Sequence, residues 1–205
     1  MPANFAGRLA AIQRKRQTNL GLLMRPRLQQ LPLPMQKYDD PFLPFGKAVI
    51  AETRGLVCAY VFDVAAYLAL GAAGAVALER TIAYARATHD TLTILHGPFA
   101  SPDYVEAAGE GGFAVDALTV VDEALLEPYT SAGFGAFVVR SGEAPVIIPL
   151  PGDAGSYWPD AELFTLLSPA DHSLQIRLAG ERALYAGRGD DFAERARQAL
   201  EAKRA

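Results

Sequence analysis

The sequence has little cysteine, no excess of basic residues and no long apolar run. Its single cysteine, Cys58, cannot form an internal disulfide or a cysteine-based zinc site, which favours a reducing compartment. The 19 Lys and Arg residues are fewer than the 23 Asp and Glu residues, whereas nucleic-acid-binding proteins are usually basic. No apolar run reaches the roughly 18 to 20 uncharged residues of a membrane span. Basic residues from Arg8 to Arg16 interrupt the first apolar positions, so no signal peptide is expected. We therefore expect a cytoplasmic protein with no nucleic-acid partner and no membrane partner.

The composition supports a packed core, because 51% of the 205 residues are hydrophobic and 20% are charged. We expect one domain over residues 1–205. As far as residue 130, apolar periodicity predicts helices alternating with strands whose apolar residues are continuous. That pattern is typical of a parallel sheet covered by helices. The expected helices are 4–17, 45–54, 72–87, one from Pro102 to about 109, and 123–130. The expected strands are 19–24, 56–62, 91–95 and 116–121, with a long loop over 25–44.

This alternation breaks after residue 134. Strands are expected at 135–140 and 145–150, but parallel neighbours need a crossover of about a dozen residues. The two strands must be antiparallel, non-adjacent in the sheet, or the remnant of a deletion. A helix at 159–167, a strand at 173–178 and a C-terminal helix from about Asp190 follow. The total is about seven strands, one short of a standard (β/α)8 barrel.

Several segments resemble the orotidine 5′-phosphate decarboxylase family, in particular its longer bacterial type. The resemblance covers most of residues 1–140 and then the last third of the chain. It implies a TIM-barrel-like α/β fold, here shortened, with one βα segment lost after the fifth strand. It also implies pairing through the open ends of the barrels and cofactor-free decarboxylation of orotidine monophosphate to UMP. The segments are YDDPFLPFGKAVIAETRGLVCAY (38–60), ALGAAGAVALERTIAYARA (69–87), ALTVV (117–121) and ALYAGRGDDFAERARQAL (183–200).

The positions that carry the family's catalysis differ in this chain. The family has a lysine at the end of the second strand, and Val61 stands there in this chain. At the end of the third strand the family has an Asp-x-Lys-x-x-Asp motif, whose key places are taken here by His96, Pro98 and Ser101. The aspartate of the first strand corresponds to Arg25. Decarboxylation by the family mechanism needs a lysine that neutralises and protonates a developing carbanion. Val61 and Pro98 can do neither.

We therefore expect a catalytically inactive homologue, in the family of pyrimidine and UMP biosynthesis, that acts as a binding or assembly subunit and not as an enzyme. Its expected partner is another barrel of the same family, either a second copy in a homodimer or an active homologue in a heteromer, docked across the carboxyl ends of the strands.

Two alternatives remain open. One is an active lyase of the same family, or a related phospho-ligand enzyme, whose chemistry has moved to residues such as His96, Ser101, Asp122 and Arg140. The other is a sensor of a phosphate-bearing small molecule. For a phosphate, the candidate binding residues are Arg140, Gly152, Gly155 and Arg182, because glycine-rich turns after late barrel strands can offer backbone N–H groups. His96 could equally be a structural or loop histidine. No pair of histidines has metal-ligand spacing, so we expect neither a metal nor a cofactor.

Overall fold

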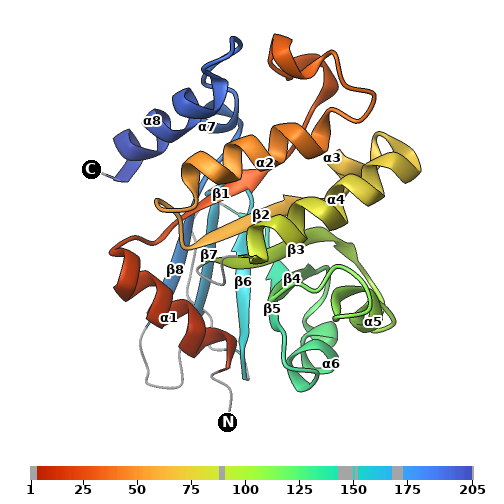
Figure 1. Ribbon diagram of the computed structural model, residues 1–205. Helices are drawn as coiled ribbons and strands as arrows, with labels where there is room; N and C mark the ends of the chain where they lie inside the picture. The colour runs from red at the N-terminus through yellow and green to blue at the C-terminus, as the bar shows by residue number, and fades with distance from the viewer. Residues whose placement is uncertain (1–3, 88–90, 143–149, 151, 168–172, 205) are drawn as a thin grey trace.

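The computed structural model describes residues 4–87, 91–142, 150, 152–167 and 173–204. Within these ranges, eight strands form a closed barrel in chain order (Figure 1). The expected α/β barrel is thereby confirmed, whereas the expectation of about seven strands is wrong. The strands are β1 (Leu20–Met24), β2 (Ala59–Asp63), β3 (Leu92–Phe99), β4 (Ala117–Val120), β5 (Gly135–Val139), β6 (Ala154–Trp158), β7 (Leu163–Leu167) and β8 (Ser173–Ala179).

Helices cover the first half of the barrel and its final strand. Helix α2 packs against both α4 and α8, while α1 lies at the opposite end of the barrel from α3 and α5 (Figure 1). No helix in the described part of the chain is long and apolar enough to cross a membrane. The helices are α1 (Phe5–Arg16), α2 (Phe42–Thr53), α3 (Val64–Leu68), α4 (Gly71–Arg86), α5 (Tyr104–Ala108), α6 (Leu126–Ser131), α7 (Glu181–Leu184) and α8 (Phe192–Arg204), with 3-10 turns η1 (Leu28–Gln30), η2 (Leu33–Met35) and η3 (Glu123–Leu125).

Strands β1 to β6 are parallel, as their continuous apolar runs predict. Most expected boundaries in this half agree with the structure within a few residues. Helix α2 begins earlier than expected, at Phe42, because Pro44 lies in its first turn, where the missing proline N–H has no helical partner to lose. The short helix α3 and the extension of β3 to Phe99 were not expected.

The helix expected at 159–167 is wrong, because this segment contains the turn and second strand of a hairpin. Strand β7 is antiparallel to both β6 and β8. Phe164 and Leu166 belong to the buried cluster inside the barrel, whereas Leu163 and Leu167 are only half-buried. This period of two is that of a strand, although the same leucine-rich segment also fits a helical spacing. The strand expected at 145–150 falls almost wholly outside the described residues.

Helix α1 closes the amino-terminal end of the barrel. The Phe5 ring packs edge-on against Phe137, with the ring centroids 5.7 Å apart. The Asp153 carboxylate, just before β6, accepts hydrogen bonds from the backbone N–H groups of Phe5 at 2.8 Å and Ala6 at 3.3 Å. A carboxylate at the first turn satisfies donors that a helix leaves unpaired and favours its positive end. The other end of the barrel is therefore the one at which side chains can form a site.

Candidate functional site

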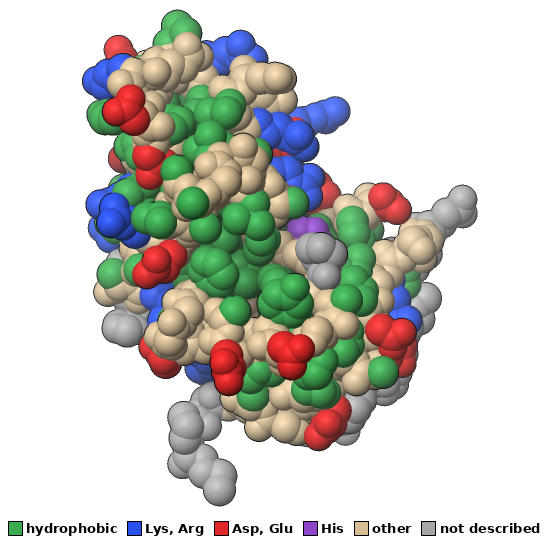
Figure 2. Space-filling view, turned by 90° about the vertical axis from the view of Figure 1, so that its right-hand side faces the viewer, with side chains coloured by type: hydrophobic (Ala, Val, Ile, Leu, Met, Phe, Trp, Pro, Cys, Tyr) green, Lys and Arg blue, Asp and Glu red, His purple; other side chains and the backbone are tan. Residues whose placement is uncertain are grey.

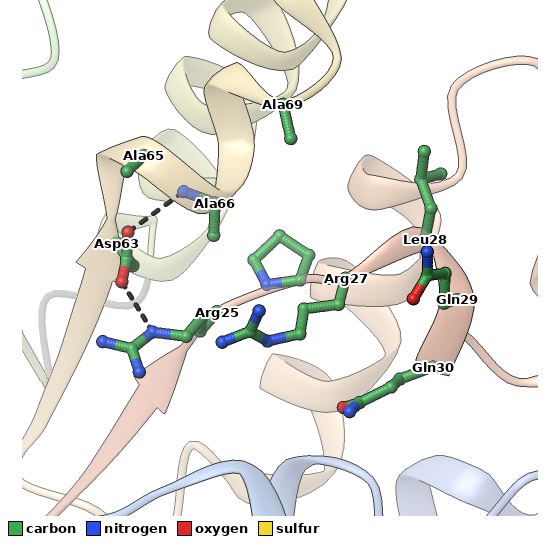
Figure 3. A pocket seen from close by; sticks show the side chains of 10 residues that line it. Arg25, Arg27, Leu28, Gln29, Gln30, Asp63, Ala65, Ala66 and Ala69 are labelled. Carbon is green, nitrogen blue, oxygen red and sulfur yellow. Dashed lines mark hydrogen bonds and ion pairs between the residues drawn. The ribbon is translucent and has the colours of Figure 1, made fainter.

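An ion pair lies at the carboxyl ends of the first two barrel strands. Arg25 directly follows β1 and Asp63 ends β2, and the Arg25 Nε lies 2.6 Å from the Asp63 Oδ2 (Figure 3). The other carboxylate oxygen accepts a hydrogen bond from the Ala66 N–H at 3.0 Å, which makes Asp63 the N-cap of α3. Both oxygens are therefore engaged, and the residue is 8% exposed. Asp63 is a buried carboxylate that accepts a hydrogen bond at each oxygen.

Sequence reasoning missed Asp63. The usable signal was its position between an apolar strand and the helix-forming run from Val64, where aspartate is a preferred N-cap. The pairing itself depends on the register of the sheet, in which Leu23 lies beside Val61. That register aligns the two strand ends and brings the next residues of each strand together.

His96 lies beside Asp63 in the sheet register, on the neighbouring strand β3. Its Nδ1 is 3.0 Å from the Thr119 Oγ1, which also donates to the Gly97 carbonyl and accepts from the Gly97 N–H. Thr119 has one hydroxyl proton, which can go either to the Gly97 carbonyl or to Nδ1. When it goes to the carbonyl, Nδ1 donates to Thr119 and Nε2 is the basic nitrogen of the neutral imidazole.

The surroundings of His96 favour the neutral ring. Burial lowers the pKa of His96 below its ordinary value of 6.5, opposed by the nearby Asp63 charge and assisted by that of Arg25. The ring packs edge-on against Tyr157, with the centroids 5.0 Å apart. His96 thus resembles a poised base more closely than a surface histidine.

The other expected catalytic positions take no part in this cluster. Val61 is fully buried within the barrel, and Pro98 lies in β3. Ser101 donates to the exposed Asp103 carboxylate at 2.7 Å. Asp122 caps η3 through the Ala124 N–H at 2.8 Å.

The expected phosphate-binding residues are not brought together. Gly155 lies in β6 and pairs with Phe137, near the start of β5, so both it and Gly152 lie toward the amino-terminal end of the barrel. Arg182 is exposed on α7, after β8, at the carboxyl end. Arg140 follows β5 and forms an ion pair with Glu123. A single phosphate group cannot contact opposite ends of a barrel, so the expectation of one combined turn-and-arginine site does not fit the structure.

Two kinds of comparison relate the chain to known proteins, although no family model matches it. The curated orotidine 5′-phosphate decarboxylase of Herpetosiphon aurantiacus is 35% identical over 79 residues, which cover 38% of this chain and 30% of the relative. That of Parabacteroides distasonis is 33% identical over 73 residues, covering 36% of this chain and 26% of the relative.

Solved structures agree with the sequence matches. A crystal structure from Toxoplasma gondii, assigned as an orotidine-monophosphate decarboxylase, is 25% identical with a TM-score of 0.60, over 69% of this chain and 50% of that one. Over these segments in sequence, and over about two thirds of its length in fold, the chain is similar to orotidine 5′-phosphate decarboxylases. The OMP decarboxylase of Leishmania donovani, at 20% identity and a TM-score of 0.56 over 69% of this chain and 55% of that one, shares the fold. The chain spans about half the length of these structures.

The lysines of this chain lie away from the barrel interior. Lys47 and Lys203 lie on the outer helices α2 and α8, and Lys15 lies on α1 at the amino-terminal end. Lys37 is exposed in the loop after β1, where its Nζ lies 5.2 Å from the Tyr38 ring centre. These are all the lysines of the sequence, so no ammonium group lies inside the barrel.

Proposed function

We propose that the chain is a non-decarboxylating member of its family and acts as a binding or assembly subunit. The observation that carries this proposal is the absence of an ammonium group from the barrel interior. Val61 occupies the position of the lysine that the resemblance implies, and every lysine lies on an outer helix, on α1 or in an exposed loop. A carbanion formed at this end of the barrel would have neither a neutralising cation nor a proton donor of that kind.

The charges that are present do not replace that arrangement. The Arg25 guanidinium is paired with Asp63, which reduces the field it can offer to a developing negative charge. Arginine is also too weak an acid to give up a proton in this chemistry. The cluster therefore supports binding better than decarboxylation.

The proposed partner is a second copy of this chain, docked across the carboxyl ends of the strands. Apart from Val76 on α4, the exposed large hydrophobic residues of the described chain all follow the carboxyl ends of β1 to β4. Figure 2 shows hydrophobic side chains gathered around a hollow on this face. Contiguous exposed apolar surface of this kind is typical of an interaction site. The residues are Leu28, Leu33, Tyr38, Leu68, Tyr104 and Val121.

A decarboxylation assay tests the catalytic part of this proposal. Purified protein is incubated with orotidine monophosphate, and loss of substrate is followed by absorbance, with an active bacterial member of the family as the positive control. We expect no turnover above the rate without protein. Turnover that is lost in a His96→Ala variant would contradict the proposal.

A second candidate function is an active lyase or phospho-ligand enzyme with relocated catalytic groups. The observation that favours it is the imidazole of His96 beside the Arg25–Asp63 pair, because a neutral imidazole next to a charge pair can act as a general base. The same assay, repeated with Asp63→Asn and His96→Ala, separates the two candidates: activity that depends on both side chains supports the enzyme.

A further inference from the structure

A cavity of about 600 Å³ opens beside the Arg25–Asp63 pair, between the loop that follows β1 and helix α3. Arg25, Arg27, Gln29 and Gln30 supply its polar wall from the loop side. Three alanines of the α3 segment, together with Leu28 and Pro26, supply its apolar wall (Figure 3). The cavity shares Arg25 and Asp63 with the candidate site, and its other lining residues belong to the loop after β1 and to the α3 segment.

The two arginines are held close together and each uses one edge for a carboxylate. Arg25 donates through Nε to Asp63, and Arg27 donates through Nε to the Glu181 Oε1 at 2.7 Å. The same Glu181 oxygen lies 3.9 Å from the Arg25 Nη1, so both guanidinium groups approach one carboxylate. The loop is also fixed by Tyr185, whose hydroxyl donates to the Arg25 carbonyl and accepts from the Arg27 N–H.

The charged groups of this wall leave mainly donors unused. A guanidinium has five N–H groups, and the structure gives hydrogen bonds within the described chain only to the Nε of Arg25 and of Arg27. Asp63, the carboxylate that lines the cavity, already accepts a hydrogen bond at each oxygen. A ligand that engages the two arginines must therefore bring acceptors, and guanidinium edges match the oxygens of phosphate and carboxylate groups.

We propose that this cavity binds the oxyanion, phosphate or carboxylate, of a small ligand through the terminal nitrogens of Arg25 and Arg27. The rest of the ligand lies against the alanines of the α3 segment. This site uses none of the turn residues that the sequence suggested for phosphate. It goes beyond the proposed function and stands whether or not the protein decarboxylates anything, so the two proposals fail separately.

Titration calorimetry with two probes, inorganic phosphate and succinate, tests the site on the full chain at low salt. We expect saturable binding of at least one probe, weakened by added sodium chloride. Whichever probe binds more tightly identifies the kind of oxyanion. Arg27→Gln should weaken that binding at least about tenfold, because it removes charge-assisted hydrogen bonds from a half-exposed side chain that the fold can spare.

The matched control is Arg195→Gln, which removes an exposed arginine of α8 that does not line the cavity and should leave the affinity unchanged. Ala69→Glu, which places a carboxylate at the exposed alanine wall, should abolish binding without disturbing the core. Circular dichroism confirms that each variant is folded. Absence of saturable binding in the unmodified protein, or an equal loss in Arg27→Gln and Arg195→Gln, would overturn the proposal.

Discussion

At the scale of single residues, Asp63 has a double role, because it caps α3 and neutralises Arg25. Replacing Asp63 by Ala should lower the free energy of unfolding by about 2 to 3 kcal/mol, since it removes the cap and leaves a partly buried guanidinium without its partner. Urea denaturation at pH 7 measures this change.

The control for this prediction is Asp63→Asn, which keeps an oxygen for the Ala66 N–H and loses only the charge. It should cost less than Asp63→Ala. Equal stability of Asp63→Ala and the unmodified protein would mean that neither the cap nor the ion pair contributes.

The lowered pKa of His96 predicts that the protein becomes less stable as the pH falls. Because the folded state lowers the pKa of His96 below 6.5, the unfolded chain binds more protons in the range between the two values. The contribution of His96 is therefore fully present above pH 6.5 and is lost as the pH falls through its folded pKa.

Unfolding free energies measured from pH 7.5 to pH 5 should fall more steeply for the unmodified protein than for His96→Gln. Proton NMR of the imidazole, assigned with the same variant, should show titration below pH 6.5. A His96 pKa at or above 6.5 would contradict the prediction and would require a closer interaction with Asp63 than the structure contains.

The sequence places His96 just after an expected strand at 91–95, whereas in the structure it lies within β3, which continues to Phe99. Sequence reasoning did not find the Arg25–Asp63 pair. That contact joins residues 38 positions apart and exists only through the register of β1 against β2. A residue type can be read locally, whereas a pairing across strands depends on the whole sheet.

At the scale of elements, the first half of the barrel, its last strand and its last helix were predictable, whereas β6 and β7 were not. The parallel strands up to β5 are separated by helices or long connections, which apolar periodicity identifies well. Strands β6 and β7 instead form a hairpin in which β7 runs against both neighbours. A short leucine-rich segment such as Leu163–Leu167 fits either period, and only closure of the barrel decides between them.

Gly155 illustrates how tightly this hairpin closes the barrel. A Cβ at this position would lie 2.4 Å from the Thr165 carbonyl oxygen and 2.8 Å from the Phe137 ring. Gly155→Ala should therefore destabilise the fold by about 1 to 3 kcal/mol, because backbone and a packed ring must both move. Thermal or urea unfolding measures the loss.

Gly111→Ala is the control, because a Cβ there would meet nothing within 4 Å. That change should leave stability unchanged or raise it slightly by restricting the unfolded chain. If Gly155→Ala were equally neutral, the close approach of β6 and β7 would not exist in solution.

At the scale of the whole molecule, the carboxyl face of the barrel combines an internal charge cluster with an apolar rim. The rim residues Leu33 and Leu68 are 70% and 48% exposed, a large exposure for leucine side chains. Within the described residues, most of the 3-10 turns and short helices follow the carboxyl ends of the strands (Figure 1). The face is therefore the natural place for the proposed contact with a second copy.

The double variant Leu33→Arg and Leu68→Arg should convert a dimer to a monomer, because opposing guanidinium groups would repel one another across a contact that otherwise buries leucine. Native mass spectrometry and sedimentation at about 10 µM protein, a concentration far above the Kd of a stable dimer, measure the mass. Val76→Arg is the matched control: Val76 is 42% exposed but lies on α4, so it should remain dimeric. If the unmodified protein is monomeric, pairing with a second copy is refuted, and an active homologue is the next partner to test. If the double variant remains dimeric, the interface lies elsewhere on the barrel.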